Sequence, residues 1–140
     1  MKRSWLKRAG FKKRKKKTER QKLIDDNDEL VRQILRLRDK VCQYSGKTDN
    51  LQVSHFISRE NLHLRWNLDN VVLINAGIHA FTFHKNPAIH KEFMVKHIGL
   101  EKVERFEMQN RIATKTLYTC DIEIIKGQLT KELERLKELL

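Results

Sequence analysis

The stretch of sequence that decides the fold is residues 51–87, LQVSHFISRENLHLRWNLDNVVLINAGIHAFTFHKNP. It opens with a short β-prone run at 51–57 and contains a second apolar run at 71–74, both of strand length. Residues 59–70 between the two runs are predicted to be an irregular loop. A break of three residues follows the second run and precedes a predicted helix.

On the N-terminal side, residues 41–46 are also β-prone, and the turn-rich residues 47–50 join them to 51–57, which predicts a hairpin. Thr18 and Gln21 have the spacing of a capping box, so a helix is predicted to begin there. Its apolar residues then recur on one face as far as about Lys40, at Leu30, Ile34, Leu37 and Val41.

On the C-terminal side, Pro87 can begin a helix that ends at about Ile98, where Gly99 is a good stop signal. A further helix is predicted from the apolar residues Leu100, Val103, Phe106 and Ile112. The last segment has a narrow apolar stripe, which indicates a helix packed within the chain or a homodimer contact, at Ile122, Ile125, Leu129, Leu133, Leu136 and Leu140. Together these elements predict an α+β fold, a small unit of strands and helix flanked by N- and C-terminal helices.

The positive charge is concentrated at the N-terminus. The chain has 30 Lys and Arg against 18 Asp and Glu, a net charge of +12, and residues 1–20 hold eleven of the basic residues and one acid. Because like charges repel one another and bury nothing, residues 1–17 are predicted to be a disordered arm. Residues 18–140 are predicted to be a folded domain, with its core at about 41–90 and C-terminal helices at about 100–140. The arm is expected to contact nucleic-acid phosphates through six successive cations, Lys12, Lys13, Arg14, Lys15, Lys16 and Lys17. It could instead serve solubility or localisation.

Composition argues against a membrane or secreted protein. No apolar run approaches the roughly 18 to 20 residues that a spanning helix needs, and the basic N-terminus lacks the apolar segment of a signal peptide. A cytoplasmic location is therefore expected. In that reducing environment Cys42 and Cys120 are expected to be free thiols.

The side chains of residues 51–87 suit hydrolysis of a phosphodiester. His55 stands at the end of a predicted strand, and a neutral imidazole can take a proton from water near neutral pH. Arg59 and Arg65 can each meet a phosphate with two parallel hydrogen bonds, or can brace the loop through a carboxylate such as Asp69. Lys85 could join them from the helix side.

Four short pieces of sequence follow one another in a characteristic order, namely Cys42-x2-Ser45-Gly46, Ser54-His55-Phe56-x2-Arg59, Leu64-Arg65-Trp66-Asn67-Leu68-Asp69-Asn70-Val71 and His79-x4-His84-x-Asn86-Pro87. In this combination they resemble the HNH, or ββα-metal, endonuclease superfamily, and within it the phage NinG (Rap) recombination nucleases. The resemblance implies a ββα-metal unit that cleaves duplex or branched DNA, leaving 5′-phosphate and 3′-hydroxyl ends. It also implies a phage setting, DNA recombination or processing in the cytoplasm of a bacterial host.

The resemblance implies a role for each polar residue of the unit. His55 is expected to be the general base, and Asn70 to fix the loop that holds it or, as in some relatives, to bind metal. His79 and His84 are expected metal ligands, but they are five residues apart, so a break in the regular helix is needed for both to reach one ion. Magnesium or manganese is the expected ion, and imidazole ligands would also suit zinc or nickel.

This chain departs from its relatives in two places. Many of them hold a structural zinc with two Cys-x-x-Cys pairs, whereas Ser45, Asn75 and Ile78 replace three of those cysteines here. One thiolate cannot build a four-ligand zinc site, so no structural zinc is expected. Many relatives also place an Asp or His metal ligand directly before the base, and Ser54 is the candidate ligand at that position.

The sequence thus predicts a metal-dependent HNH DNA endonuclease. Two alternatives stay open. The unit could be a degenerate HNH fold that binds DNA without cutting it. The chain could also be a basic RNA-binding or assembly protein in which the order His55, Asn70, His79 is accidental.

Overall fold

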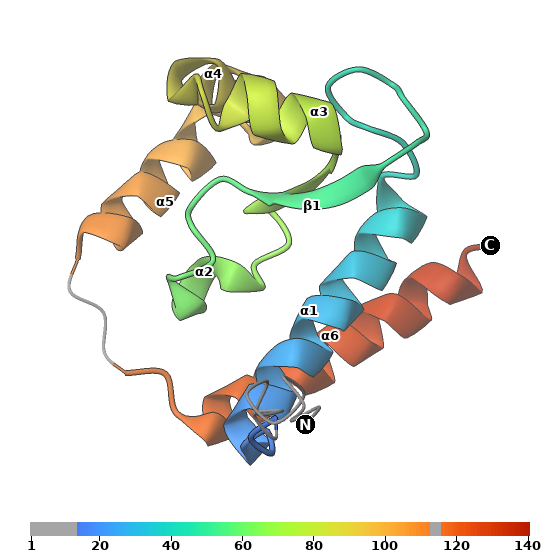
Figure 1. Cartoon of the computed structure of the whole chain (residues 1–140), viewed down its shortest axis with the longest axis vertical. Coiled ribbons are helices and arrows are strands. Elements are labelled where there is room, and N and C mark those ends of the chain that lie inside the picture. Colours follow the sequence, from blue (N-terminus) through green and yellow to red (C-terminus); the bar gives the residue numbers. More distant parts are fainter. Residues whose placement is uncertain (1–13, 113–115) are drawn as a thin grey trace, which may run out of the picture.

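The computed structural model describes residues 14–112 and 116–140 and has an α+β fold, mostly helical with one two-stranded antiparallel sheet (Figure 1). In chain order the elements are α1 (Glu19–Arg38), β1 (Leu51–His55), α2 (Leu62–Arg65), β2 (Val71–Asn75), α3 (Ala76–Ile78), the π-helix η2 (His79–Phe83), α4 (Pro87–Ile98), α5 (Leu100–Arg111) and α6 (Thr119–Glu138). Within the described ranges, no helix combines the length and the apolar character needed to cross a bilayer.

Strand β2 lies at the centre of the molecule, and all five of its residues are buried. Val71 and Leu73 pack against residues of α1 and α6, whereas Val72 and Ile74 face the opposite way and pack against Phe83 and residues of α4 and α5. Successive side chains of a strand point to opposite faces, so a strand that is apolar at every position is covered on both sides. The apolar run at 71–74 therefore places β2 between two groups of helices.

Each edge of β2 has a partner. One edge pairs with β1 in a register that places Ser54 opposite Val72 and His55 opposite Val71. The other edge is covered by the end of α1, where the Arg38 guanidinium donates to the Val71 carbonyl at 3.0 Å and the Asp39 carboxylate accepts from the Leu73 N–H at 3.0 Å. Ion-paired side chains thus take the place of a third strand on this edge.

The long helices α1 and α6 pack against one another and cover the Val71 face of the sheet (Figure 1). The predicted stripe of α6 lies in this contact, with Ile122, Leu129 and Leu133 buried and Leu136 partly buried. Leu140, the last residue of the stripe, is exposed. Intramolecular packing therefore accounts for the stripe, and a homodimer contact through the C-terminal helix stays a prediction.

The predicted helix ends agree with the structure where a local capping signal marks them. The Thr18 hydroxyl accepts from the Gln21 N–H at 3.1 Å, so Thr18 caps α1. The second half of the predicted capping box is absent, because the Gln21 side chain donates to Asp25 instead of reaching back to Thr18. Pro87 begins α4, and Gly99, at φ 94°, follows its last residue.

The predicted hairpin between residues 41–46 and 51–57 is wrong, because β1 pairs with β2 instead. Residues 41–46 form a tight turn in which the Gly46 N–H donates to the Cys42 carbonyl at 2.8 Å and Gly46 has a φ of 76°. A glycine at positive φ and this short-range hydrogen bond favour a turn over an extended strand. The predicted irregular loop at 59–70 is also partly helical, since it contains α2.

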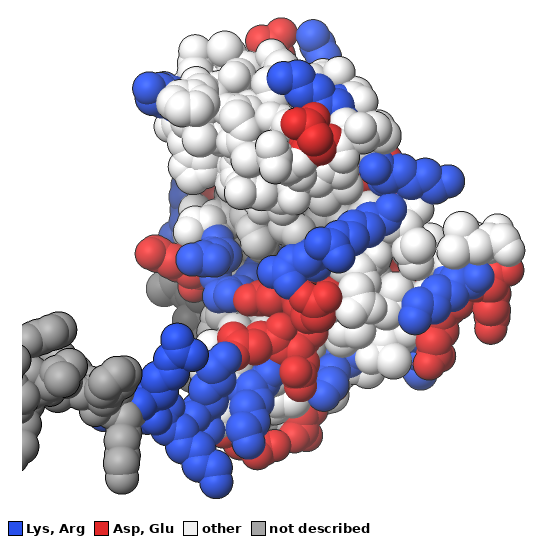
Figure 2. Space-filling model, turned by 45° about the vertical axis from the view of Figure 1, so that its right-hand side comes forward, with Lys and Arg blue, Asp and Glu red and all other residues white. Residues whose placement is uncertain are grey.

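Only part of the basic arm belongs to the described chain. Arg14, Lys15, Lys16 and Lys17 are exposed and precede the first helix, and Lys17 forms an ion pair with Asp25 at 2.6 Å. Lys12 and Lys13 lie outside the described residues. Figure 2 shows basic side chains gathered at this end of the molecule, whereas the opposite end, formed by α3 and α4, is mainly uncharged on the face in view.

We expect Ile34→Ala to lower the free energy of unfolding by about 2 to 5 kcal/mol, because Ile34 is fully buried where α1, β2 and α6 meet. Urea unfolding followed by circular dichroism measures the loss. Ile124→Ala is the matched control, since Ile124 is 60% exposed on α6 and its replacement should change stability by less than about 0.5 kcal/mol. Equal losses in the two variants would contradict the assignment of the core.

Candidate active site

A single buried amide organises the loop between the two strands. Asn70 is fully buried, and its Oδ1 accepts from the Ile57 N–H at 2.8 Å. Its Nδ2 donates to the Ile57 carbonyl at 3.1 Å and to the Leu64 carbonyl at 3.0 Å. The amide thus ties the start of β2 to the residues that follow β1 and to the end of α2. It satisfies the N–H and the carbonyl of Ile57, which would otherwise be buried without partners, and it adds a second partner to the Leu64 carbonyl, which also accepts from the Asn67 N–H at 3.2 Å.

His55, the last residue of β1, is oriented by this loop. Its Nε2 lies 3.0 Å from the Arg65 carbonyl oxygen. A carbonyl can only accept, so Nε2 carries the proton and Nδ1 keeps its lone pair. Burial lowers the pKa of His55, against the opposing effect of the hydrogen bond to the Arg65 carbonyl. The geometry therefore favours a neutral imidazole with one nitrogen available as a proton acceptor.

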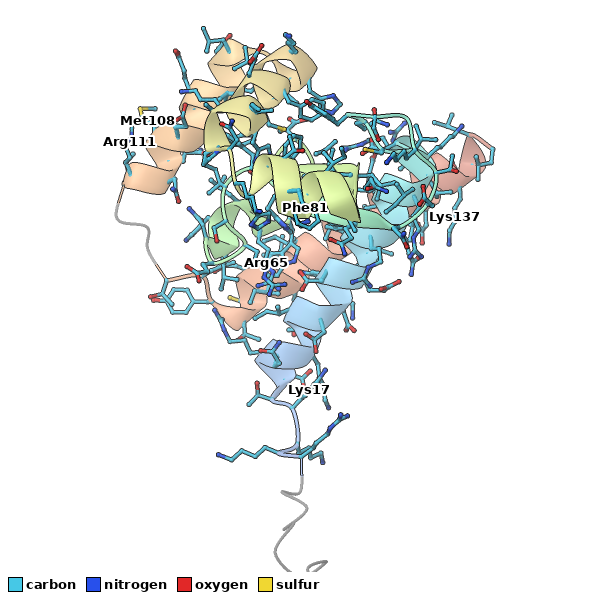
Figure 3. All side chains as sticks on the ribbon, turned by 45° about the horizontal axis from the view of Figure 1, so that its top comes forward. Lys17, Arg65, Phe81, Met108, Arg111 and Lys137 are labelled. Carbon is cyan, nitrogen blue, oxygen red and sulfur yellow. The ribbon has the colours of Figure 1, made fainter. Side chains whose placement is uncertain are left out.

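Arg65 is occupied by an acidic residue of α1. Its guanidinium makes two hydrogen bonds to the Asp28 carboxylate, from Nε at 2.9 Å and from Nη2 at 2.5 Å. Figure 3 shows Arg65 in the middle of the molecule, between α2 and α1. The sequence allowed two uses for Arg65, contact with phosphate or bracing of the loop through a carboxylate. The observed contacts brace the loop, and the carboxylate is that of Asp28. Asp69, the carboxylate considered from the sequence, pairs with Lys102 at 3.2 Å instead.

The other two predicted phosphate contacts lie on the surface. Arg59 is exposed, and among residues 14–112 and 116–140 no ion pair is formed by its guanidinium. Lys85 is also exposed, and its ammonium lies 5.1 Å from the centre of the Phe81 ring on η2. Phe81 itself is 69% exposed (Figure 3).

The π-helix η2 brings His79 and His84 together. Its hydrogen bond runs from the His84 N–H to the His79 carbonyl at 3.1 Å, which is the i to i+5 pattern. The two Nε2 atoms lie 2.9 Å apart, and the rings meet edge to face. The helix break required by the five-residue spacing is therefore present, as one π-helical turn.

His79 is held from the sheet side by Gln52. The Gln52 Oε1 lies 3.1 Å from the His79 Nδ1, so Nδ1 donates and the lone pair of Nε2 points toward His84. Burial, and then the nearby His84, lower the pKa of His79. A metal-binding histidine typically donates its second ring nitrogen in this way to a neighbouring acceptor.

Ser54 lies on the same face of β1 as Gln52, the residue that contacts His79, because the two are two residues apart on the strand. Ser54 is fully buried, and its hydroxyl has no hydrogen-bond partner among the described residues. His55 points to the opposite face, which α1 and α6 cover. The structure thus places two groups of residues on opposite faces of the β1–β2 pair. His55 lies with Asn70 and Arg65, and His79 lies with His84.

The sequence did not single out two residues of this region, Asp28 and His90. Both lie on the apolar face of a helix, Asp28 three residues before the buried Val31 and His90 four residues before the buried Met94. Such an interruption of an apolar face was the available signal. The His90 ring stacks on Phe83 with centroids 4.3 Å apart, and burial together with His79 and His84 lowers its pKa to about 4.

Cys42, Ser45, Asn75 and Ile78, the four positions considered for a structural zinc, are joined by ordinary contacts. The Ser45 N–H donates to the Cys42 sulfur at 3.4 Å, and the Asn75 N–H donates to the same sulfur. Ile78 packs against the cluster that contains Cys42. As expected, Cys42 and Cys120 are both free thiols.

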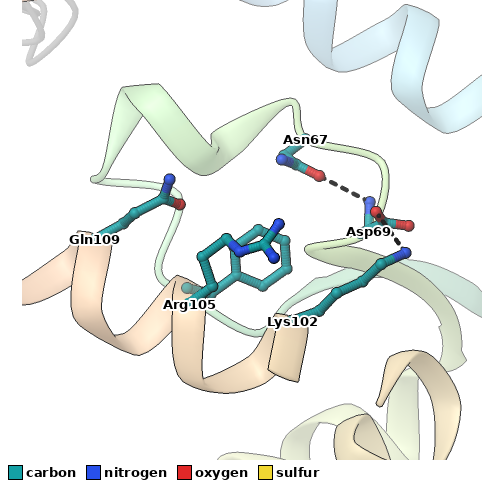
Figure 4. Close-up of a pocket in the computed structure, with 6 residues that line it drawn as sticks. Asn67, Asp69, Lys102, Arg105 and Gln109 are labelled. Atoms are coloured by element: carbon teal, nitrogen blue, oxygen red, sulfur yellow. Dashed lines mark hydrogen bonds and ion pairs between the residues drawn. The ribbon is translucent and has the colours of Figure 1, made fainter. Parts of the chain in front are cut away.

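A surface pocket between the inter-strand loop and α5 does not include the histidines. It is lined by Asn67, Asp69, Lys102, Arg105, Phe106 and Gln109 (Figure 4). Asp69 and Lys102 pair with one another across it. A substrate of His55 or His79 would consequently bind outside this pocket.

Among residues 14–112 and 116–140, no three His, Cys, Asp or Glu side chains lie close enough together to form a metal site. Comparison with protein-family models, with curated proteins and with solved structures finds no match to this chain.

We expect Asn70→Ala to destabilise the protein by at least about 2 kcal/mol, because the buried N–H and carbonyl of Ile57 each lose a partner at a cost of about 1 kcal/mol or more. Asn67→Ala is the matched control in the same loop. Asn67 is exposed and accepts one hydrogen bond, from the Asp69 N–H, so about 1 kcal/mol or less is expected. Chemical unfolding measures both, and similar losses would show that the Asn70 amide has no special role in the loop.

The lowered pKa of His90 predicts a pH-dependent stability. A histidine whose folded-state pKa is depressed stabilises the fold above its unfolded value near 6.5, and this contribution is lost as the pH falls toward 4. His90→Phe keeps the stack on Phe83 and should flatten the loss of stability between pH 6.5 and 4 by roughly 2 to 3 kcal/mol. Urea unfolding at several pH values tests this. His97→Phe, an exposed ring stacked on Phe93, is the control, and the same pH dependence in both variants would contradict the prediction.

Proposed function

We propose that this chain is a metal-dependent DNA endonuclease whose strands β1 and β2 and following helix form an HNH, or ββα-metal, unit. The observation that carries the proposal is the hydrogen bond from His55 Nε2 to the Arg65 carbonyl, which leaves Nδ1 free to accept a proton. His55 also has the lowered pKa that a neutral base requires. Asn70 supports the assignment, because its amide fixes both Ile57, two residues after His55, and Leu64, the residue before Arg65.

In this proposal the chemistry begins at His55. The free Nδ1 removes a proton from a water molecule, and the resulting hydroxide attacks phosphorus in line with the departing 3′ oxygen. The protonated imidazole keeps its Nε2 hydrogen bond to the Arg65 carbonyl, so the ring holds its orientation through the transfer. The products have 5′-phosphate and 3′-hydroxyl ends.

The residues of η2 and β1 fit a divalent cation in part. His79 and His84 present two ring nitrogens 2.9 Å apart, close enough for both to reach one ion at the usual metal–nitrogen distance of about 2.0–2.1 Å. The buried Ser54 hydroxyl, which lacks a partner, is on the same face of the sheet. When bound, the cation would neutralise charge on the phosphate and the leaving oxygen. Magnesium or manganese is the proposed ion, and imidazole donors would also suit zinc or nickel.

The substrate is proposed to lie along the outer edge of β1. In the described chain β1 pairs with β2 alone, so its second edge is not covered by another strand. His55 and His79 lie on opposite faces of the β1–β2 pair, and only a ligand at the outer edge of β1 could reach both. An extended phosphate backbone fits this requirement, and the exposed Arg59 and the basic arm could neutralise its flanking phosphates.

A second candidate function is DNA binding without cleavage by a degenerate HNH unit. One observation favours it: among residues 14–112 and 116–140, no three Asp, Glu, His or Cys side chains are grouped as metal ligands. Histidine pairs without a third strong ligand bind cations weakly. The two functions differ in the effect of a chelator on strand cleavage.

We expect the wild-type protein to nick supercoiled plasmid in the presence of manganese and to stop when EDTA is added. His55→Ala should lower the cleavage rate by roughly 10²- to 10⁴-fold while DNA binding in a mobility-shift assay is kept, because a general base is removed. His79→Ala should abolish cleavage at low metal concentration. His97→Ala, at an exposed position of α4, is the matched histidine control and should cut at the wild-type rate.

The outcomes separate the candidates. Binding without cleavage under every metal condition would support the degenerate unit and overturn the nuclease proposal. Cleavage by His55→Ala at the wild-type rate would remove His55 as the base. Stronger competition by RNA than by DNA would favour an RNA-binding protein.

A further inference from the structure

Asp28 gathers the polar hydrogens of two neighbouring residues on the loop. Its Oδ1 accepts from Arg65 Nε at 2.9 Å and from Trp66 Nε1 at 2.8 Å, and its Oδ2 accepts from Arg65 Nη2 at 2.5 Å. The carboxylate comes from the middle of α1, a helix whose buried face joins the main core. The two loop side chains are thus fixed to a rigid part of the molecule.

The peptide unit between Arg65 and Trp66 contains the carbonyl that binds His55 Nε2 at 3.0 Å. Both side chains that flank this peptide are held by the same carboxylate, so the plane of the peptide is fixed from both ends. The preceding carbonyl, that of Leu64, is held by Asn70 Nδ2 at 3.0 Å. Two consecutive carbonyls are therefore oriented, one by Asn70 directly and the next through Asp28.

We infer that Asp28 is a positioning residue for His55, acting through the Arg65–Trp66 peptide to select the Nε2–H tautomer of the imidazole. The inference rests on the proposed function for its catalytic meaning, since His55 is taken as the base. The direction of effect follows from the contacts. Without the Asp28 carboxylate the Arg65 and Trp66 side chains lose their shared acceptor, so the Arg65 carbonyl is held less firmly. The imidazole then has a less fixed acceptor to determine which nitrogen carries the proton.

The surroundings make this carboxylate suited to the task. The Asp28 side chain is 31% exposed and the Arg65 side chain 16% exposed, so the ion pair is partly shielded from water and its geometry is well defined. Trp66 is buried in the core that α1 shares with β2 and α6. The clamp therefore ties the orientation of His55 to the packing of α1.

The test compares Asp28→Asn with Asp26→Asn. Asp26 lies on the same helix and also forms an ion pair with a distant residue, Lys126 at 3.0 Å, but has no described link to His55. Trp66→Phe is a second variant that keeps an aromatic ring and removes the Nε1 donor together with part of the buried ring. The full-length protein is used throughout.

Three measurements are made on each variant. The ring ¹⁵N chemical shifts of His55, recorded at a pH where the imidazole is neutral, report which nitrogen carries the proton. The plasmid cleavage assay with manganese gives kcat and KM, and thermal unfolding reports stability. A residue that served only stability would change the melting temperature without changing the tautomer.

The expected result is a single Nε2–H tautomer in the wild type and in Asp26→Asn, and a mixture of tautomers in Asp28→Asn. The kcat of Asp28→Asn should fall roughly 10- to 100-fold with little change in KM, the range seen when a group that orients a functional histidine is removed. Trp66→Phe should give a smaller change in the same direction, which keeps the inference testable if Asp28→Asn does not fold.

An unchanged His55 tautomer in both Asp28→Asn and Trp66→Phe would overturn the inference, as would an equal loss of kcat in Asp26→Asn. The tautomer measurement needs no activity. If the wild type does not cleave DNA, the proposed function fails while the ¹⁵N spectra still decide whether Asp28 orients His55. If the wild type cleaves and the tautomer is insensitive to Asp28, only the positioning role fails.

Discussion

The burial of β2 on both faces is the constraint on which the rest of the structure depends. A strand of five buried residues leaves no freedom of register, because a shift by one residue would exchange Val71 and Leu73 with Val72 and Ile74 between two different sets of helices. The antiparallel partner β1 inherits this register. Ser54 is therefore directed toward η2 and α4, and His55 toward α1.

The polar contacts complete what the apolar packing begins. Arg38 and Asp39 satisfy backbone groups on the outer edge of β2, and Asn70 satisfies those of the loop that returns to it. Each of these side chains replaces a strand or a water molecule that the buried backbone would otherwise need. The loop is irregular in path but fully specified in hydrogen bonding, and a histidine at its start can for that reason be held in one orientation.

Local signals and long-range contacts explain what the sequence could predict. The ends of α1 and α4 were predictable because Thr18, Pro87 and Gly99 act within a few residues of themselves. The partner of β1 was predicted wrongly because residues 41–46 are β-prone and near in sequence, whereas the true partner lies beyond the inter-strand loop. Contacts at a separation of 37 residues, such as Asp28 with Arg65, leave no local pattern except a polar residue on an apolar helix face.

The site shows the same division. The order of His55, Asn70 and His79 in the sequence predicts a site, but it does not predict how they are grouped in space, since that depends on the strand face. Three residues separate His55 from Gln52, the contact of His79, which is about 10 Å along a strand. That separation is compatible with one phosphodiester, because an in-line displacement places the attacking water and the leaving oxygen on opposite sides of phosphorus. In the proposed nuclease, His55 and the pair of His79 and His84 therefore act on one phosphodiester from opposite faces of the β1–β2 pair. The substrate then binds on the surface of the protein and not in a closed pocket.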